Sequence, residues 1–239
     1  MAAAQVFKVS LSYKTPQAKD DYCTGQEDDV KYIDIAQLLA NDLGGAAKSF
    51  YSLNQDDPRI VSSTATTKYG ATITLGSDGT ISYDPTAVAQ IQALAEGEPL
   101  LDTFTYTIRL GDGTLSTATV TIMITGANDA AEIGTPTALE VMEDAEVSGT
   151  GKLTASGSIS VSDADKGQAA FQTEVTGAAD NRGSLTLAAD GTYSYVVDNS
   201  RVQYLGAGES KVDIFTVKAL DGTAKDISFT INGVNDAAI

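Results

Sequence analysis

The chain has 239 residues, enough for one large domain or two domains of about 110 residues, and its 42% hydrophobic content excludes a disordered tail. Its 32 acidic and 15 basic side chains give a net charge of −17, which disfavours nucleic acid and anionic membranes as partners and favours cations. The sequence has no His, so it lacks the commonest general base, and its single cysteine, Cys23, excludes an intramolecular disulfide.

Residues 1–16 form a predicted N-terminal extension. Its apolar side chains lie between Gln5 and Lys14, but it lacks the charged and apolar regions of a signal peptide. Every apolar run in the chain is far shorter than a membrane span. The sequence therefore predicts no membrane insertion and, for an exported protein, a route that needs no cleaved leader.

An internal repeat organises the rest of the chain. Four landmarks return in the same order at an offset of just over 100 residues, which makes two modules the expected organisation. We place them at residues 17–131 and 132–239. The matched landmarks, first copy and then second, are Glu27-Asp28 and Glu143-Asp144, 78–83 (DGTISY) and 190–195 (DGTYSY), 94–105 and 205–216 at an offset of 111, and 126–131 (GANDAA) and 233–238 (GVNDAA).

Apolar and polar residues alternate with a period of two along short segments of each copy, which predicts half-buried strands. Asp-Gly pairs mark turns between them. Two short helices are predicted at 34–40 and 87–95, which contain Ala, Leu and Gln without Gly or Pro. The many short strands predict an all-β protein of two tandem Ig-like Greek-key β-sandwich modules. The clearest strand segments are 103–110, 118–125, 215–219 and 227–231.

Acidic side chains gather at the predicted strand ends and where the modules join. Calcium takes six to eight oxygen ligands, so it suits carboxylates that converge from several loops. Any single one of these side chains could instead be a solvated surface charge. The sequence has no EF-hand loop and no glycine-rich nonapeptide repeat. The candidate calcium ligands are Glu27, Asp28, Asp102, Asp112, Asn128, Asp129, Glu143, Asp144, Asp163, Asp165, Asp213, Asp221, Asn235 and Asp236.

At these residues the sequence resembles a known family. Residues 161–168 (VSDADKGQ) are similar to the Asp-x-Asp-x-Gly-Asn calcium loop of cadherin repeats, and 110–129 resemble the end of such a repeat. Residues 139–238 resemble the VCBS repeats of bacterial surface adhesins. The first module is a looser relative, with 41–45 (NDLGG) in place of the aspartate loop. The resemblance implies two cadherin-like modules.

The cadherin resemblance also implies where calcium would bind. An inter-module site would take ligands from the first module, the linker and the second module: Glu27, Asp102, Asn128, Asp129, Asp163 and Asp165. Two positions depart from the cadherin pattern, because Gly126 replaces the first acidic residue of the linker and no glutamate follows Asp102 as in the Asp-Arg-Glu motif. A second site is implied at the far end, with Glu143, Asp144, Asp213, Asn235 and Asp236.

A small protein of two such modules is similar to the rhizobial adhering proteins. This resemblance implies a secreted, cell-surface-associated monomer that binds acidic bacterial exopolysaccharide or capsule in a calcium-dependent way, as a lectin or adhesin of the biofilm matrix. Bound calcium would let a chain of charge −17 approach a polyanion. Residues 236–239, an acid followed by a small apolar tail, resemble the uncleaved signals of leaderless type I secretion. The alternative is a calcium-rigidified structural extender from a large surface adhesin.

Catalysis is not expected. Without His, paired carboxylates of the glycosidase kind are the remaining option, and nothing in the sequence selects a pair. No sugar site can be assigned either. The sequence has no Trp, and a tyrosine in a β protein usually packs against other residues, even where it falls outside the clearest strands, as Tyr51, Tyr69 and Tyr204 do.

Overall fold

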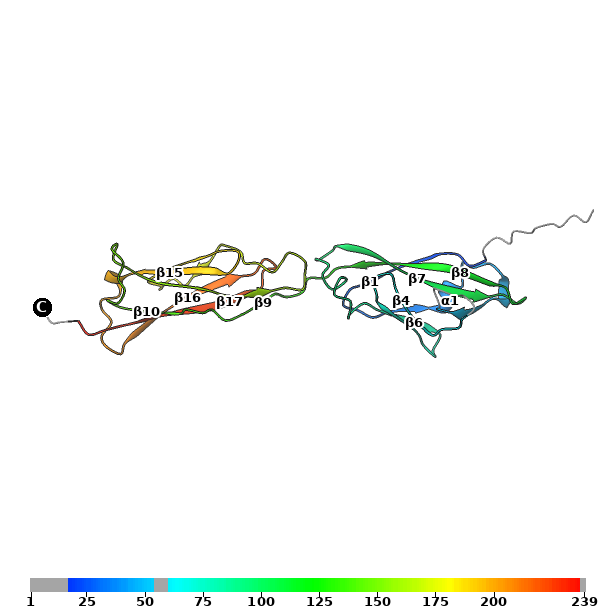
Figure 1. The fold of residues 1–239 in the computed structure, drawn as a ribbon, viewed down its shortest axis with the longest axis horizontal. Helices are drawn as coiled ribbons and strands as arrows, with labels where there is room; N and C mark the ends of the chain where they lie inside the picture. Colours follow the sequence, from blue (N-terminus) through cyan, green and yellow to red (C-terminus); the bar gives the residue numbers. More distant parts are fainter. Residues whose placement is uncertain (1–16, 54–59, 237–239) are drawn as a thin grey trace, which may run out of the picture. The chain divides into compact units, whose positions relative to one another are not determined.

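The computed structural model describes residues 17–53 and 60–236, and the chain divides into two compact units, Met1–Ala127 and Asn128–Ile239 (Figure 1). The predicted N-terminal extension and the predicted secretion signal after Asp236 lie outside the described residues. Both units are built mainly from strands, so the predicted all-β class is confirmed. The sequence placed the boundary between the modules at 131/132, slightly further along the chain.

Unit 1 is a β-sandwich of two four-stranded sheets. One sheet has the strand order β1-β8-β7-β3 and the other β2-β6-β5-β4. The edge strand β1 runs parallel to β8, whereas β7 and β8 form a long antiparallel pair. The strands are β1 (Asp21–Gln26), β2 (Lys31–Asp34), β3 (Ser49–Ser52), β4 (Thr64–Thr66), β5 (Thr72–Leu75), β6 (Thr80–Asp84), β7 (Pro99–Arg109) and β8 (Leu115–Thr125).

The helical content of unit 1 is small. Helix α1 (Ile35–Leu38) begins where the Asp34 carboxylate accepts the backbone N–H of Ala36, so the helix predicted at 34–40 is confirmed in a shorter form. A 3-10 turn, η1 (Gly45–Ala47), follows. The helix predicted at 87–95 is wrong. That segment forms successive turns that place Ile91 and Leu94 in the core, and core packing decides against the helix propensity.

Unit 2 is also a β-sandwich, but the edge strands of its four-stranded sheet are shorter. Its sheets have the orders β10-β17-β16-β13 and β11-β15-β14, and β12 pairs with β9. Again the edge strand, β10, runs parallel to the last strand, β17. The elements are β9 (Glu132–Ile133), β10 (Glu140–Met142), β11 (Lys152–Ser158), β12 (Val161–Ser162), β13 (Thr176–Gly177), β14 (Ser184–Leu187), β15 (Thr192–Asp198), η2 (Asn199–Arg201), β16 (Ser210–Lys218) and β17 (Ala224–Asn232).

The core of each unit lies between its two sheets, as the predicted alternation requires. In β8 every second side chain from Ala118 to Ile124 is buried, and in β17 Ile227, Phe229 and Ile231 are buried. The rings of Tyr195 and Phe229 stack in the core of unit 2 with centroids 4.5 Å apart. These rigid sheets leave the acidic loops at the ends of the strands.

Candidate functional site

Each unit buries a glutamate directly after its parallel edge strand. Glu27 follows β1 and Glu143 follows β10, and both side chains are 0% exposed. Glu27 Oε1 accepts the backbone N–H of Ala127 at 2.6 Å, and Glu143 Oε2 accepts that of Val234 at 3.2 Å. The acidic pairs that the repeat matched therefore have the same structural place, where the last strand of each unit ends.

Glycine precedes both of these backbone donors for a steric reason. A Cβ on Gly126 would lie 2.2 Å from the carbonyl oxygen of Ala95, and one on Gly233 would lie 2.6 Å from that of Gly206. A side chain cannot be accommodated so close to a backbone oxygen. Close backbone packing thus explains why Gly126 stands where the cadherin linker has an acidic residue.

The Glu143 end of unit 2 gathers three carboxylates. Glu143 Oε1 accepts no hydrogen bond from any residue that the structure describes. Burial raises the pKa of Glu143, the Val234 N–H opposes this rise, and the charges of Asp236 and Asp144 add to it. Asp144 Oδ1 accepts from Asn199 Nδ2 at 2.6 Å and from Gln203 Nε2 at 2.9 Å, and these bonds lower the pKa of Asp144.

The opposite end of unit 2 gathers a second acidic group around Asp165, which is 1% exposed. Its Oδ2 accepts from the backbone N–H of Asp129 at 3.2 Å and from Gln168 Nε2 at 3.0 Å, and its own N–H donates to Asp163 Oδ1 at 2.9 Å. Asp165 Oδ1 and Asp163 Oδ2 are buried and have no hydrogen-bond partner within the described ranges. Asp221 Oδ2 accepts the N–H of Ala131 at 3.0 Å nearby.

The neighbouring aspartates also affect the pKa of Asp165. Burial is the main cause that raises the pKa of Asp165; the Asp129 N–H lowers it, and the charges of Asp163, Asp129 and Asp221 raise it. Asp221 shows the reverse, because bonds from Thr223, Ala131 and Asn128 outweigh the raising effect of burial and lower its pKa. The charges of three aspartates thus act on Asp165 at this end, where Asp163 Oδ2 and Asp165 Oδ1 accept no hydrogen bond from the described residues.

Two predicted ligands lie in a different setting. Asp102 and Asp213 are 0% exposed and point into the cores. Asp102 accepts hydrogen bonds from the hydroxyls of Thr67 and Tyr83 and from two backbone N–H groups. Asp213 accepts from the Tyr195 hydroxyl at 2.8 Å and from the N–H groups of Arg182 and Gly183. Their role as metal ligands stays a prediction, and since protein donors occupy them, we leave them out of the sites proposed below.

The remaining predicted ligands are spread over the ends of both units. Asp28, Asp112, Asn128 and Asn235 have exposed side chains. Asp112 caps the turn before β8 by accepting the N–H of Thr114, so the eleven-residue strand, roughly 35 Å long, separates it from Glu27. Glu27 belongs to unit 1, whereas Asn128, Asp129, Asp163 and Asp165 belong to unit 2. Joint calcium binding by these residues stays a prediction.

The unused oxygens are of the chemical kind that a hard cation binds. Among residues 17–53 and 60–236, however, no three His, Cys, Asp or Glu side chains are arranged so that they could hold a metal ion. Calcium also takes backbone carbonyls and water as ligands in flexible geometry. The open oxygens of Glu143, Asp163 and Asp165 are therefore candidate calcium ligands, not a formed site. The sequence did not reveal that Gln168, Asn199 and Gln203 orient these carboxylates, since an amide side chain carries no distinctive pattern.

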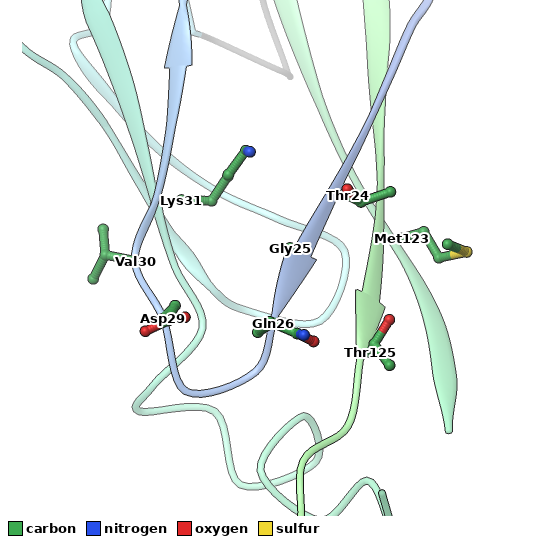
Figure 2. A pocket seen from close by; sticks show the side chains of 8 residues that line it. All are labelled: Thr24, Gly25, Gln26, Asp29, Val30, Lys31, Met123 and Thr125. Atoms are coloured by element: carbon green, nitrogen blue, oxygen red, sulfur yellow. The ribbon is translucent and has the colours of Figure 1, made fainter. Parts of the chain in front are cut away.

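Unit 1 also contains a groove of about 590 Å³ between β1 and β2. Figure 2 shows the Lys31 side chain extending into the space between the two strands. The lining residues offer one acid and one base but no aromatic ring for a sugar to stack on. They are Thr24, Gly25, Gln26, Asp29, Val30, Lys31, Met123 and Thr125.

Family models distinguish the two units. Residues 128–233 match the bacterial cadherin-like domain, and residues 14–123 match the bacterial Ig domain. The cadherin-like prediction is thus met by unit 2, while unit 1, predicted to be of the same kind, matches the Ig model. Both are non-catalytic, adhesion-type folds, and cadherin-like domains generally bind calcium. Comparison with curated proteins finds no match.

Solved cadherin structures are similar to this chain. The protocadherin GammaB4 extracellular domain has a TM-score of 0.50 at 14% identity, over 91% of this chain and 31% of that one. Protocadherin gammaB7 EC3-6 gives 0.49 at 14% identity, over 92% and 47%, and Drosophila N-cadherin EC1-4 gives 0.43 at 10% identity, over 90% and 49%. The chain spans less than half the length of these structures. No helix described by the structure has the length and apolar character needed to span a bilayer.

Proposed function

We propose that this chain is an extracellular, calcium-dependent adhesin of lectin type that binds acidic bacterial polysaccharide. The observation that carries the calcium part is the set of buried carboxylate oxygens without a donor, Glu143 Oε1, Asp163 Oδ2 and Asp165 Oδ1, at the ends of unit 2. A buried acceptor left without a partner costs about 1–3 kcal/mol, and more when it is charged. A bound calcium would remove that cost by coordinating these oxygens.

The net charge connects calcium with the polysaccharide. At −17 the chain repels a polyanion, and each bound calcium would cancel two of these charges. Residues Asp163 and Asp165 at one end, and Glu143 and Asp144 at the other, would hold the ions. Association with the cell surface and action as a monomer belong to the same proposal.

The second candidate is a structural extender of a larger surface adhesin. The Ig and cadherin-like domains are consistent with such a role, and calcium would then stiffen the modules without any glycan binding. Both candidates share the calcium sites and differ in the polysaccharide, so the experiment needs two readouts.

The first readout is thermal unfolding in EDTA and in millimolar calcium. Calcium at 100 times its Kd should stabilise the unit that binds it by about 2.7 kcal/mol, a rise in Tm of several degrees. Asp163→Asn with Asp165→Asn should remove the part of this rise that comes from their end of unit 2, whereas Glu140→Gln with Glu174→Gln, two exposed carboxylates of the same unit, should preserve the whole rise. A wild-type Tm that is the same in EDTA and calcium would contradict calcium binding.

The second readout is retention on an immobilised acidic polysaccharide from the bacterium that produces the protein. We expect retention in calcium and release by EDTA. A protein that calcium stabilises but that the polysaccharide retains in neither condition would contradict the lectin role and support the extender.

A further inference from the structure

A small cationic and aromatic patch lies on unit 2 of this acidic chain. We call it the arginine patch and define it as Arg182, Arg201 and Tyr204. The Arg182 guanidinium carbon lies 5.5 Å from the centroid of the Tyr204 ring, and Arg201 Nη1 donates a hydrogen bond to the carbonyl oxygen of Arg182. The tyrosine is 55% exposed, so its ring remains accessible beside the two guanidinium groups.

The fold anchors the backbone that carries this patch. The N–H of Arg182 donates to both oxygens of the buried Asp213 carboxylate at 2.9 Å. Arg201 ends η2, and the segment that follows is anchored by Val202 and Leu205, which are 0% and 4% exposed. The backbone of both halves is thus fixed by the core, which lowers the backbone entropy lost when a ligand binds.

The guanidinium groups are available for an anion. Neither Arg182 nor Arg201 forms an ion pair with a carboxylate in the part of the chain that the structure describes. Asp180 lies close enough for the charge of Arg182 to act on it, but its pKa is lowered mainly by Lys211, whose Nζ lies 2.8 Å from Asp180 Oδ2. Two of the chain's four arginines are therefore on one surface with no carboxylate of the described residues at ion-pair distance.

This combination of groups suits a charged sugar. Arginine binds a carboxylate through two parallel hydrogen bonds, and an exposed tyrosine ring offers an apolar face to the C–H groups of a pyranose. We propose that the arginine patch is the subsite where the chain binds uronate residues, the carboxylate-bearing sugars of an acidic polysaccharide. This inference rests on the proposed function and names its sugar class and its place.

The test measures binding of the full chain, in millimolar calcium, to an oligogalacturonate and to the neutral oligosaccharide obtained by reducing its carboxyl groups. Wild type should bind the acidic oligosaccharide and not the reduced one. Arg182→Gln with Arg201→Gln should weaken acidic binding by about tenfold to a hundredfold, the range expected for charge-assisted hydrogen bonds. Tyr204→Ala should weaken it less, and Tyr204→Phe should leave it nearly unchanged because the ring remains.

The matched control is Arg109→Gln with Lys218→Gln, which removes two exposed positive charges elsewhere and should have little effect. All the altered side chains are exposed, and an unchanged Tm would show that each variant folds. Equal binding by the arginine variant and the control would overturn the inference, as would a preference for the reduced oligosaccharide. If wild type is retained by the bacterial polysaccharide while the arginine variant is retained equally, the inference alone fails. If wild type is not retained at all, the proposed function fails.

Discussion

Asp42 of unit 1 and Asp165 of unit 2 occupy corresponding loops, after the second strand region of each sandwich, and differ in one respect. They are 5% and 1% exposed, and each accepts a backbone N–H from the segment that enters its unit, Lys19 at 2.7 Å and Asp129 at 3.2 Å. In unit 1 the buried hydroxyl of Tyr106 is shared between two carboxylates: it lies 2.8 Å from Asp21 Oδ2 and 3.2–3.3 Å from the two Asp42 oxygens.

Unit 2 has no such hydroxyl at the matching position. The repeat offset of 111 that relates Asp102 to Asp213 places Val217 where unit 1 has Tyr106, and Asp165 Oδ1 is left with no donor among the described residues. One buried carboxylate is thus satisfied by the protein, and the other is open to a cation. The difference teaches that burial of an aspartate does not identify a metal ligand; an unused oxygen does.

The largest expected effect concerns a buried carboxylate whose two oxygens already accept hydrogen bonds from the protein. Asp213→Ala should destabilise unit 2 by about 3–4 kcal/mol, because the Tyr195 hydroxyl and two backbone N–H groups would be buried without an acceptor. Denaturant unfolding should give the same loss in EDTA and in calcium. Tyr195→Phe, which removes one donor, should cost only about 1 kcal/mol. A loss that appears only with calcium would instead support Asp213 as the ligand that the sequence predicted.

A prediction of intermediate size concerns Asp42, which would lose a hydrogen-bond donor and so resemble Asp165 of unit 2. Tyr106→Phe removes the hydroxyl that Asp21 and Asp42 share and should destabilise unit 1 by about 1–2 kcal/mol in EDTA. Millimolar calcium should recover part of this loss, as measured by thermal unfolding. Tyr83→Phe is the control, since Asp102 keeps its other donors and calcium should recover nothing. If calcium has no effect on Tyr106→Phe, a missing hydroxyl does not create a cation site.

The smallest effect concerns pH. Burial raises the pKa of Asp21. The hydrogen bond from the Tyr106 hydroxyl lowers this pKa, and the charge of Asp42 raises it further. The folded state therefore binds this proton more tightly, and the resulting stability is present in acid and is lost as the pH rises through the raised pKa. Asp21→Asn should accordingly gain stability relative to wild type between about pH 3 and pH 6, by less than about 1 kcal/mol because the side chain is partly exposed. Denaturant unfolding at both values measures it, and an equal difference at both would contradict it.

The sequence by itself determined the two-unit β architecture. The repeat and the period-two alternation are local patterns. Glu27 and Glu143 were identified because the same Glu-Asp pair recurs at the corresponding position of each unit. Local pattern failed where core packing overrode propensity, as in the turns between Ala87 and Ala95. It also did not separate an Ig unit from a cadherin-like one.

Only the tertiary structure decided which carboxylates are open. Tyr106 lies 64 residues from the Asp42 that it satisfies, and Arg182 donates to Asp213 across 31 residues. A sequence lists acceptors, but whether a donor reaches them depends on contacts between distant strands. The same reason hid the arginine patch, whose two arginines come from either side of the β14–β15 hairpin and meet only when unit 2 is folded.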